Sequence, residues 1–143
     1  MKFLDTNVIL RYLTRDDPEK AGACYQLFQR VNSGEEILIT CESIIAEVVY
    51  VLRSPRAGYG LNRDEISARL VPILMLRGLR LHQKQLYINA LNIYASSTSF
   101  DFEDAIAIAH MQHHDINEIV SYDKDFDSFP GIDRLEPPLV RNR

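Results

Sequence analysis

The sequence has few cysteines and no long apolar run, and both absences narrow the class of protein. Only Cys24 and Cys41 are present, and their spacing is not that of a metal-binding motif. We therefore expect two reduced thiols in a cytoplasmic protein. No apolar stretch reaches the roughly 18 residues that a membrane span requires. No signal peptide precedes the first predicted strand, so we expect no contact with a membrane.

The charge distribution excludes a broad polycationic nucleic-acid binder. Residues 1–100 carry a net charge of +2, whereas residues 101–143 carry a net charge of −6. A polyanion bound near the acidic part would need a bridging divalent cation between the two negative partners. The 143 residues are 46% hydrophobic and 25% charged, without repeats or low-complexity tracts. We predict a single globular domain over residues 1–143.

A short apolar run at the N-terminus leads directly into polar residues, with Leu4 followed by Asp5, Thr6 and Asn7. This pattern predicts a buried strand over residues 2–4 that ends in a loop. Asp5 would then lie at the carboxyl end of the strand, the edge at which open α/β sheets bind ligands. The alternative is that Asp5 only caps the helix that follows it.

A single carboxylate interrupts an otherwise apolar helix that we predict near residues 42–53. Residues 44–52 are apolar on nearly every side of this helix except at Glu47, which indicates a buried helix. A buried carboxylate requires a cation, a proton or a metal ion. The alternative to a metal is a buried ion pair with an arginine such as Arg11 or Arg53.

Two acids mark the start of another predicted helix. Asp101 fits an N-cap position, and Asp104 follows three residues later in the first turn. Both positions favour ionised acids through free backbone N–H groups and the helix dipole. Capping alone would therefore explain them, and direct metal contact is the alternative that we favour for Asp104.

The pattern of the N-terminus recurs near the C-terminus. The apolar residues 119–120 lead through Ser121 to Asp123, again as a strand that ends in an aspartate. Asp125 and Asp127 follow, and we interpret them as solvated loop acids. In a parallel α/β arrangement, strand ends and helix starts share one edge of the sheet.

We therefore expect four distant acids to converge on one pocket, namely Asp5, Glu47, Asp104 and Asp123. Brought together in one pocket, these carboxylates would repel one another. Divalent cations relieve such repulsion, and carboxylate ligands suit Mg²⁺ or Mn²⁺. A metal-dependent reaction at a phosphate ester is the expected chemistry.

These motifs, in this order and over nearly the whole chain, resemble the PIN-domain ribonucleases and most closely their VapC-type toxins. The resemblance implies an α/β fold of three layers, in which helices cover both faces of a mostly parallel sheet of strand order 3-2-1-4-5. It also implies a Mg²⁺- or Mn²⁺-dependent endoribonuclease. The partners it implies are an RNA substrate, a cognate antitoxin and a second copy of the chain in a homodimer.

Residue by residue, the resemblance assigns catalytic and metal-binding roles to the four converging acids. Thr6, Asn7 and Ser121 match the polar residues beside those acids, and Asp101 matches an acid found in part of the family. The loop between Arg53 and Arg63 departs from the family pattern. It either contacts RNA or a partner protein, or is a solvated connector.

Two other functions are compatible with parts of the sequence. A phosphatase of the haloacid-dehalogenase type also begins with a strand that runs into aspartate, but it needs a second aspartate where Asn7 stands and a lysine that no motif offers. A non-catalytic PIN-like module that binds RNA or protein would have lost one or more of the acids. All four are present.

Overall fold

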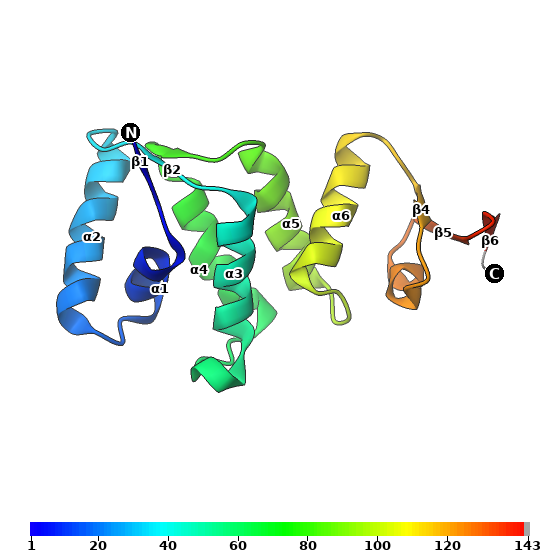
Figure 1. Ribbon diagram of the computed structural model, residues 1–143, viewed down its shortest axis with the longest axis horizontal. Helices are drawn as coiled ribbons and strands as arrows, with labels where there is room; N and C mark the ends of the chain where they lie inside the picture. Colours follow the sequence, from blue (N-terminus) through cyan, green and yellow to red (C-terminus); the bar gives the residue numbers. More distant parts are fainter. Residues whose placement is uncertain (142–143) are drawn as a thin grey trace.

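Short strands alternate with helices along the chain in the computed structural model, which describes residues 1–141 (Figure 1). The α-helices of the described residues are α1 (Thr6–Thr14), α2 (Pro18–Ser33), α3 (Glu42–Arg53), α4 (Arg63–Leu74), α5 (Lys84–Ser96) and α6 (Phe102–His113). The strands are β1 (Lys2–Phe3), β2 (Leu38–Ile39), β3 (Leu79–Arg80), β4 (Glu118–Val120), β5 (Asp133–Glu136) and β6 (Val140–Arg141). Two 3₁₀ turns, η1 (Pro55–Ala57) and η2 (Lys124–Ser128), complete the described elements. Residues 142–143 of the predicted domain lie outside the described part.

The first sheet has the order β1-β2-β3, and all three of its strands are parallel. Its register pairs Phe3 with Ile39 and Leu38 with Leu79. Leu38 and Leu79 point into the helical core, whereas Phe3 is 58% and Ile39 is 37% exposed. Because neighbouring side chains of a strand point to opposite faces, one face of this sheet is covered and the other is open.

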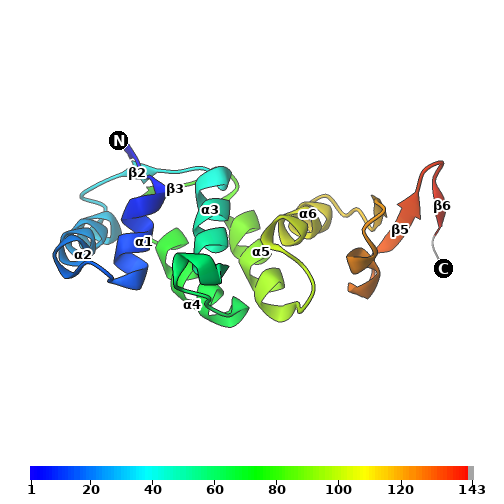
Figure 2. The same cartoon turned by 60° about the horizontal axis from the view of Figure 1, so that its bottom comes forward.

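The second sheet has the order β4-β5-β6, with β4 parallel to β5 and β5 antiparallel to β6. Ile119 pairs with Arg134 in the register of the parallel ladder. In both views, β4 lies beyond α6, on the side away from β1 (Figures 1 and 2). This C-terminal unit, residues 118–141, is therefore separate from the first sheet.

The predicted single sheet of order 3-2-1-4-5 is present in two pieces. The neighbours 3-2-1 and 4-5 are confirmed, but no ladder joins β1 to β4 within residues 1–141. The predicted α/β class, with parallel strands and helices, is confirmed. One face of the first sheet, which carries Phe3 and Ile39, is exposed to solvent. Sequence pattern specifies a strand and its buried face, but it does not specify which neighbouring edge the strand pairs with.

Local sequence signals explain where the helices begin and end. The Asp17 side chain accepts a hydrogen bond from the Lys20 N–H, Pro18 occupies the first turn of α2, and Gly34 ends the helix in a left-handed conformation. Pro72 lies inside α4, which ends two residues later at Leu74. A proline inside a helix removes one backbone hydrogen bond, which agrees with that early end.

Two apolar clusters hold the molecule together. The larger one joins the first sheet to α1 through α6, with Ile45, Leu52 and Leu91 fully buried. The smaller one consists of Phe100, Ile108 and Phe126, together with partly buried residues such as Ile119 and Phe129, and packs the C-terminal unit against α6. Helix α6 thus contributes to both clusters, the larger one with the first sheet and the smaller one with the C-terminal unit. Within the described residues, no helix is long and apolar enough to cross a bilayer.

Candidate metal-binding site

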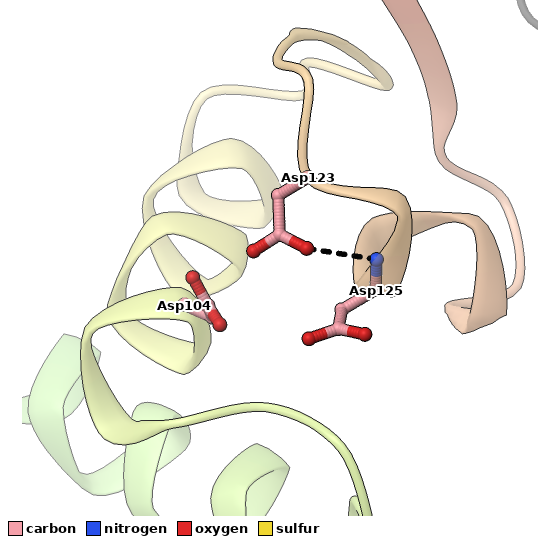
Figure 3. Close-up of side chains that lie close together, drawn as sticks. All are labelled: Asp104, Asp123 and Asp125. Atoms are coloured by element: carbon pink, nitrogen blue, oxygen red, sulfur yellow. Dashed lines mark hydrogen bonds between the residues drawn. The ribbon is translucent and has the colours of Figure 1, made fainter.

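Three carboxylates meet between the start of α6 and the turn after β4. Asp104, Asp123 and Asp125 each offer an oxygen, and these atoms lie within 4.8 Å of one another (Figure 3). Asp104 is half-buried and the two others are exposed. Oxygen atoms at these separations can converge on one hard divalent cation.

Asp104 is fixed by the helix start that it belongs to. The Asp101 Oδ1 accepts a hydrogen bond of 2.8 Å from the Asp104 N–H, and the Asp101 N–H donates one of 3.4 Å to the Asp104 Oδ2. This reciprocal pair is a capping box. The predicted N-cap role of Asp101 is confirmed. The same hydrogen bonds fix the position of the Asp104 carboxylate in the acidic group.

The pKa of the Asp104 carboxyl is raised to about 6. Partial burial contributes most, and the negative charge of Asp101 and the contact with its side chain contribute next, followed by the charge of Asp123. Each of these disfavours the ionised form. A cation placed among these carboxylates would remove that repulsion.

Asp123 is held by the strand end and the turn that flank it. Its Oδ1 accepts a hydrogen bond of 2.9 Å from the Asp125 N–H, as Figure 3 shows, and its own N–H donates to the Ser121 Oγ over 3.0 Å. Arg134, whose side chain is fully buried, donates to the Ser121 carbonyl over 2.9 Å. Arg134 also pairs with Asp127 and Glu136, so β5 anchors the segment that carries Asp123.

Asp5 and Glu47, the two other predicted acids, are not part of this acidic group. Asp5 occupies the N-cap position of α1, but its side chain makes no capping hydrogen bond and is exposed. The alternative that Asp5 only caps the helix therefore lacks the contact it requires. Asn7 is exposed in the first turn of the same helix.

Glu47 is tied to the start of α1 by a side-chain contact. The buried Thr6 hydroxyl donates a hydrogen bond of 2.9 Å to the Glu47 Oε2. The prediction that Glu47 is buried is wrong, because Glu47 and Tyr50 lie on an exposed face of α3. The alternative ion pair is also absent from the described contacts, since Arg11 pairs with Asp16 and Arg53 donates to the Leu61 carbonyl.

The structure therefore presents the predicted site as two half-sites. The first half-site joins Glu47 to Thr6, the residue that follows Asp5. The second contains Asp101, Asp104, Ser121, Asp123 and Asp125. The prediction that four acids converge on one pocket is not met in this arrangement, because the acidic group of the described residues contains neither Asp5 nor Glu47. The physical reason is the missing ladder between β1 and β4.

Asp125 is a candidate ligand that sequence reasoning set aside as a solvated loop acid. The turn after β4 brings its carboxylate to Asp104 and Asp123. The signal available in the sequence is the spacing of two aspartates, two residues apart, directly after a strand. Such spacing lets one carboxylate accept the backbone N–H of the other residue, as Asp123 does here.

The loop after α3 is partly structural. Tyr59 donates to Asp16 over 2.7 Å, and Arg63 donates to the carbonyl groups of Tyr94 and Phe100 while its guanidinium lies over the Tyr94 ring. The interpretation as a mere solvated connector is therefore incomplete. A groove of about 490 Å³ separates this loop from the start of α6, and its lining includes Tyr50, Arg53, Asp101 and Phe102.

The arrangement as a whole supports cation binding at the acidic group, which follows Asp101 of the groove lining along α6. The acidic group consists of three aspartates, each of which offers one carboxylate oxygen. The exposed Tyr50 and the groove border the helix start that carries Asp101 and Asp104. The residues present thus fit a hard divalent cation, whose ligands are oxygen atoms.

Comparison with protein-family models matches residues 2–132 to the PIN domain. Ribonuclease VapC13 of Mycobacterium tuberculosis is 30% identical over 137 residues, which cover 94% of this chain and 99% of that protein. A VapC ribonuclease of Aquifex aeolicus is 29% identical over 126 residues, which cover 88% of this chain and 90% of that protein.

Among solved structures, the chain is similar to Mycobacterium tuberculosis VapC20, which is described as a toxin that cleaves the sarcin-ricin loop. The sequence identity is 18% and the TM-score is 0.39, over 99% of this chain and 100% of that one.

Proposed function

This chain belongs to the PIN-domain family, and on that basis we propose that it is a VapC-type, metal-dependent endoribonuclease. The observation that carries the proposal is the group of three carboxylates, from Asp104, Asp123 and Asp125, within 4.8 Å of one another. This group occupies the sequence positions that the family match covers. The haloacid-dehalogenase alternative is set aside by the family.

Asp104, Asp123 and Asp125 would hold the metal, which we propose to be Mg²⁺ or Mn²⁺. Such an ion, when bound, lowers the pKa of a coordinated water and offsets the charge of a phosphate. The protein supplies the arrangement: the capping box orients Asp104, and Ser121 with the Asp125 N–H orients Asp123. No reorganisation of these carboxylates is then needed on binding.

We assign Asp5 and Glu47 to the same reaction as residues that orient water and substrate. The Thr6 hydroxyl holds one oxygen of Glu47 over 2.9 Å and leaves the other free for a water molecule. Asp5 has a carboxylate that its helix does not use. Asn7, exposed one residue after Thr6, is available to a phosphate oxygen.

The groove beside the acidic group is the proposed RNA-binding surface. Tyr50 is 73% exposed and lines this groove with Arg53 and Phe102. A nucleotide base can stack on an exposed tyrosine ring, and an arginine can contact the adjoining phosphate. Replacing Tyr50 with alanine should therefore weaken RNA binding more than it slows cleavage of bound RNA.

A partner that silences the enzyme follows from the same chemistry. The C-terminal part of the chain carries a net charge of −6 over residues 101–143. An antitoxin that inserts a basic side chain between Asp104 and Asp123 would occupy the position of the metal. This partner is part of the proposal because the relatives are VapC proteins.

The direct test is cleavage of bacterial ribosomal and transfer RNA by the purified chain. We expect cleavage with Mg²⁺ or Mn²⁺, none with EDTA, and products that carry 5′-phosphate ends. Asp123→Asn should reduce the rate at least about 100-fold, the size of effect seen when one electrostatic group is removed from an active site.

Asp115→Asn is the matched control. Asp115 is exposed in the turn after α6 and has a positive φ of 54°, a conformation that asparagine tolerates well. This variant loses the same charge near the same unit and should cleave at the wild-type rate. Cleavage by Asp123→Asn at that rate, or no cleavage by the wild type, would instead support a non-catalytic binding module.

A further inference from the structure

Each sheet of the described residues has two edge strands, and β1 and β4 are the edge strands that lead into the acidic motifs. In the described residues, β1 pairs only with β2, and β4 pairs only with β5. An open edge offers unsatisfied backbone groups and is a template for another strand. The open edges of β1 and β4 belong to different sheets. Each of these two strands is parallel to its one neighbour.

The free edge of β1 is defined by its hydrogen bonds. The N–H groups of Lys2 and Leu4 donate to the carbonyl groups of Ile37 and Ile39 in and beside β2. Because alternate residues of a strand point their backbone groups to opposite edges, the N–H and carbonyl of Phe3 face away from β2. The Phe3 side chain is 58% exposed, so this edge is apolar as well as unpaired.

The free edge of β4 has the same character. The Ser121 N–H donates to the Leu135 carbonyl, and the Asp133 N–H donates to the Asn117 carbonyl. These bonds direct residues 117, 119 and 121 toward β5 and leave the backbone groups of Val120 on the outer edge. Val120 is also 58% exposed.

Pairing β1 with β4 of the same chain would break the packing of the C-terminal unit against α6. The C-terminal unit is held on α6 by Phe100, Ile108 and Phe126, and α6 packs along α5. Only residues 114–117 connect α6 to β4, a link that spans at most ~14 Å when extended. In both views β1 and β4 lie on opposite sides of α3 and α6 (Figures 1 and 2).

We propose that β4 of a second copy pairs in parallel with β1, and that the exchange is reciprocal. Paired strands lie about 4.8 Å apart, and Asp5 and Asp123 both follow the carboxyl ends of their strands. Parallel pairing therefore places Asp5 and Glu47 of one copy beside Asp104 and Asp123 of the other. Each complete site is then shared between two chains, an arrangement that rests on the proposed nuclease function.

The first experiment measures the assembly without reference to activity. Light scattering on the wild-type chain should give twice the 16.5 kDa of one chain. Val120→Pro removes the outward N–H without touching a bond to β5 and should give a monomer. Val120→Thr keeps the N–H and the β-branched shape, and should remain dimeric.

Circular dichroism separates loss of pairing from loss of folding. Val120→Pro should keep the helical signal of the wild type, because its changed residue lies outside the helices. If it does not fold, Phe3→Pro, which alters the outward edge of β1 in the same way, replaces it. A wild-type monomer, or a folded proline variant that stays dimeric, would overturn the proposal.

The second experiment asks whether the sites are shared. Asp5→Asn and Asp123→Asn chains, carrying different tags, are co-expressed and purified as the mixed dimer. A shared arrangement gives one doubly altered site and one intact site, so the mixed dimer should recover about half the wild-type rate while both pure variants are inactive. Equal inactivity of all three would overturn it.

The two proposals fail in different ways. If the wild-type dimer cleaves no RNA, the nuclease function fails, and the mass of Val120→Pro still decides the strand exchange. If the wild-type chain cleaves RNA as a monomer, the exchange fails and the nuclease function stands.

Discussion

Thr6 and Glu47, which are 41 residues apart in sequence, are joined by a hydrogen bond of 2.9 Å from the hydroxyl to the carboxylate. The bond connects the residue after Asp5 to the exposed face of α3. Thr6 is buried whereas Glu47 is exposed, so the hydroxyl acts as a fixed support for a carboxylate that reaches solvent. The relationship suggests that Thr6 positions Glu47 and does not itself react.

Replacing Thr6 tests this positioning role. Thr6→Val keeps the shape of the buried side chain and removes the donor, so we expect RNA cleavage to fall about tenfold, equivalent to ~1.4 kcal/mol. The thermal midpoint should change little, because the partner Glu47 can still be solvated. Thr6→Ser retains the hydroxyl and should keep most of the rate; equal rates for both variants would remove the role.

The unused cap of Asp5 makes a prediction about stability. Asp5→Ala should leave the midpoint of thermal unfolding nearly unchanged, because its side chain makes no capping hydrogen bond. Asp17→Ala, at the start of α2, loses the bond to the Lys20 N–H and should cost about 1 kcal/mol. Thermal unfolding of the two variants side by side is the measurement, and an equal loss for both would contradict the difference.

The raised pKa of Asp104 predicts the pH dependence of stability without metal. Its carboxyl ionises near pH 4 in the unfolded chain but at about 6 in the folded chain. The unfolded state therefore loses its proton first, and stability should fall as pH rises from about 4 to 6 and then level off.

Asp104→Asn isolates this contribution. The amide oxygen can still accept the Asp101 N–H, so the capping box survives. In EDTA, thermal unfolding should show no difference from the wild type near pH 4 and a stabilisation of about 1 kcal/mol at pH 7.5, after allowance for solvent screening. A constant difference across this range would mean that Asp104 does not titrate as described.

Divalent ions should stabilise the folded chain through the acidic group. At 100 times its dissociation constant, a ligand of the folded state adds about 2.7 kcal/mol. We expect an upward shift of the melting temperature with Mn²⁺ or Mg²⁺ that Asp123→Asn loses and Asp115→Asn keeps. Identical shifts in all three proteins would place the ions elsewhere.

Arg134 should be essential for holding the strand end that carries Asp123. Its buried guanidinium joins the Ser121 carbonyl to Asp127 and Glu136. Arg134→Leu should cost about 2 kcal/mol, less than for a fully buried pair because both acids are partly exposed. Arg134→Lys keeps the charge but not the forked geometry, so its stability should lie between those of the wild type and Arg134→Leu. A leucine variant as stable as the wild type would argue against the network.

Much of the local structure could be predicted from the sequence. The predicted strands near residues 2–4 and 119–120 and the predicted helices near residues 42–53 and after Asp101 all occur. Asp101 caps its helix as predicted, and Asp17 and Asn62 cap helices by the same short-range pattern. Capping and apolar periodicity depend on residues only a few positions apart. The PIN family and its acidic motifs are likewise readable from the chain, because each motif is contiguous.

Long-range contacts were predicted less well, as α3 illustrates. Its apolar sequence suggested burial on every side, yet Tyr50 and Glu47 face solvent. Periodicity reports how apolar a face is, but whether another element covers that face depends on the rest of the fold. The contribution of Asp125 was missed for a similar reason, since only the turn of η2 brings it to Asp104.

What the sequence by itself determined is the set of elements, their caps and the carboxylates at their ends. Only the tertiary structure decided which of those carboxylates meet: Asp104 and Asp123 do, whereas Glu47 is bonded to Thr6, the residue after Asp5. The physical reason is that a strand has two edges. Its residues specify which face is buried, but the partner on each edge depends on where the whole chain places the neighbouring strand.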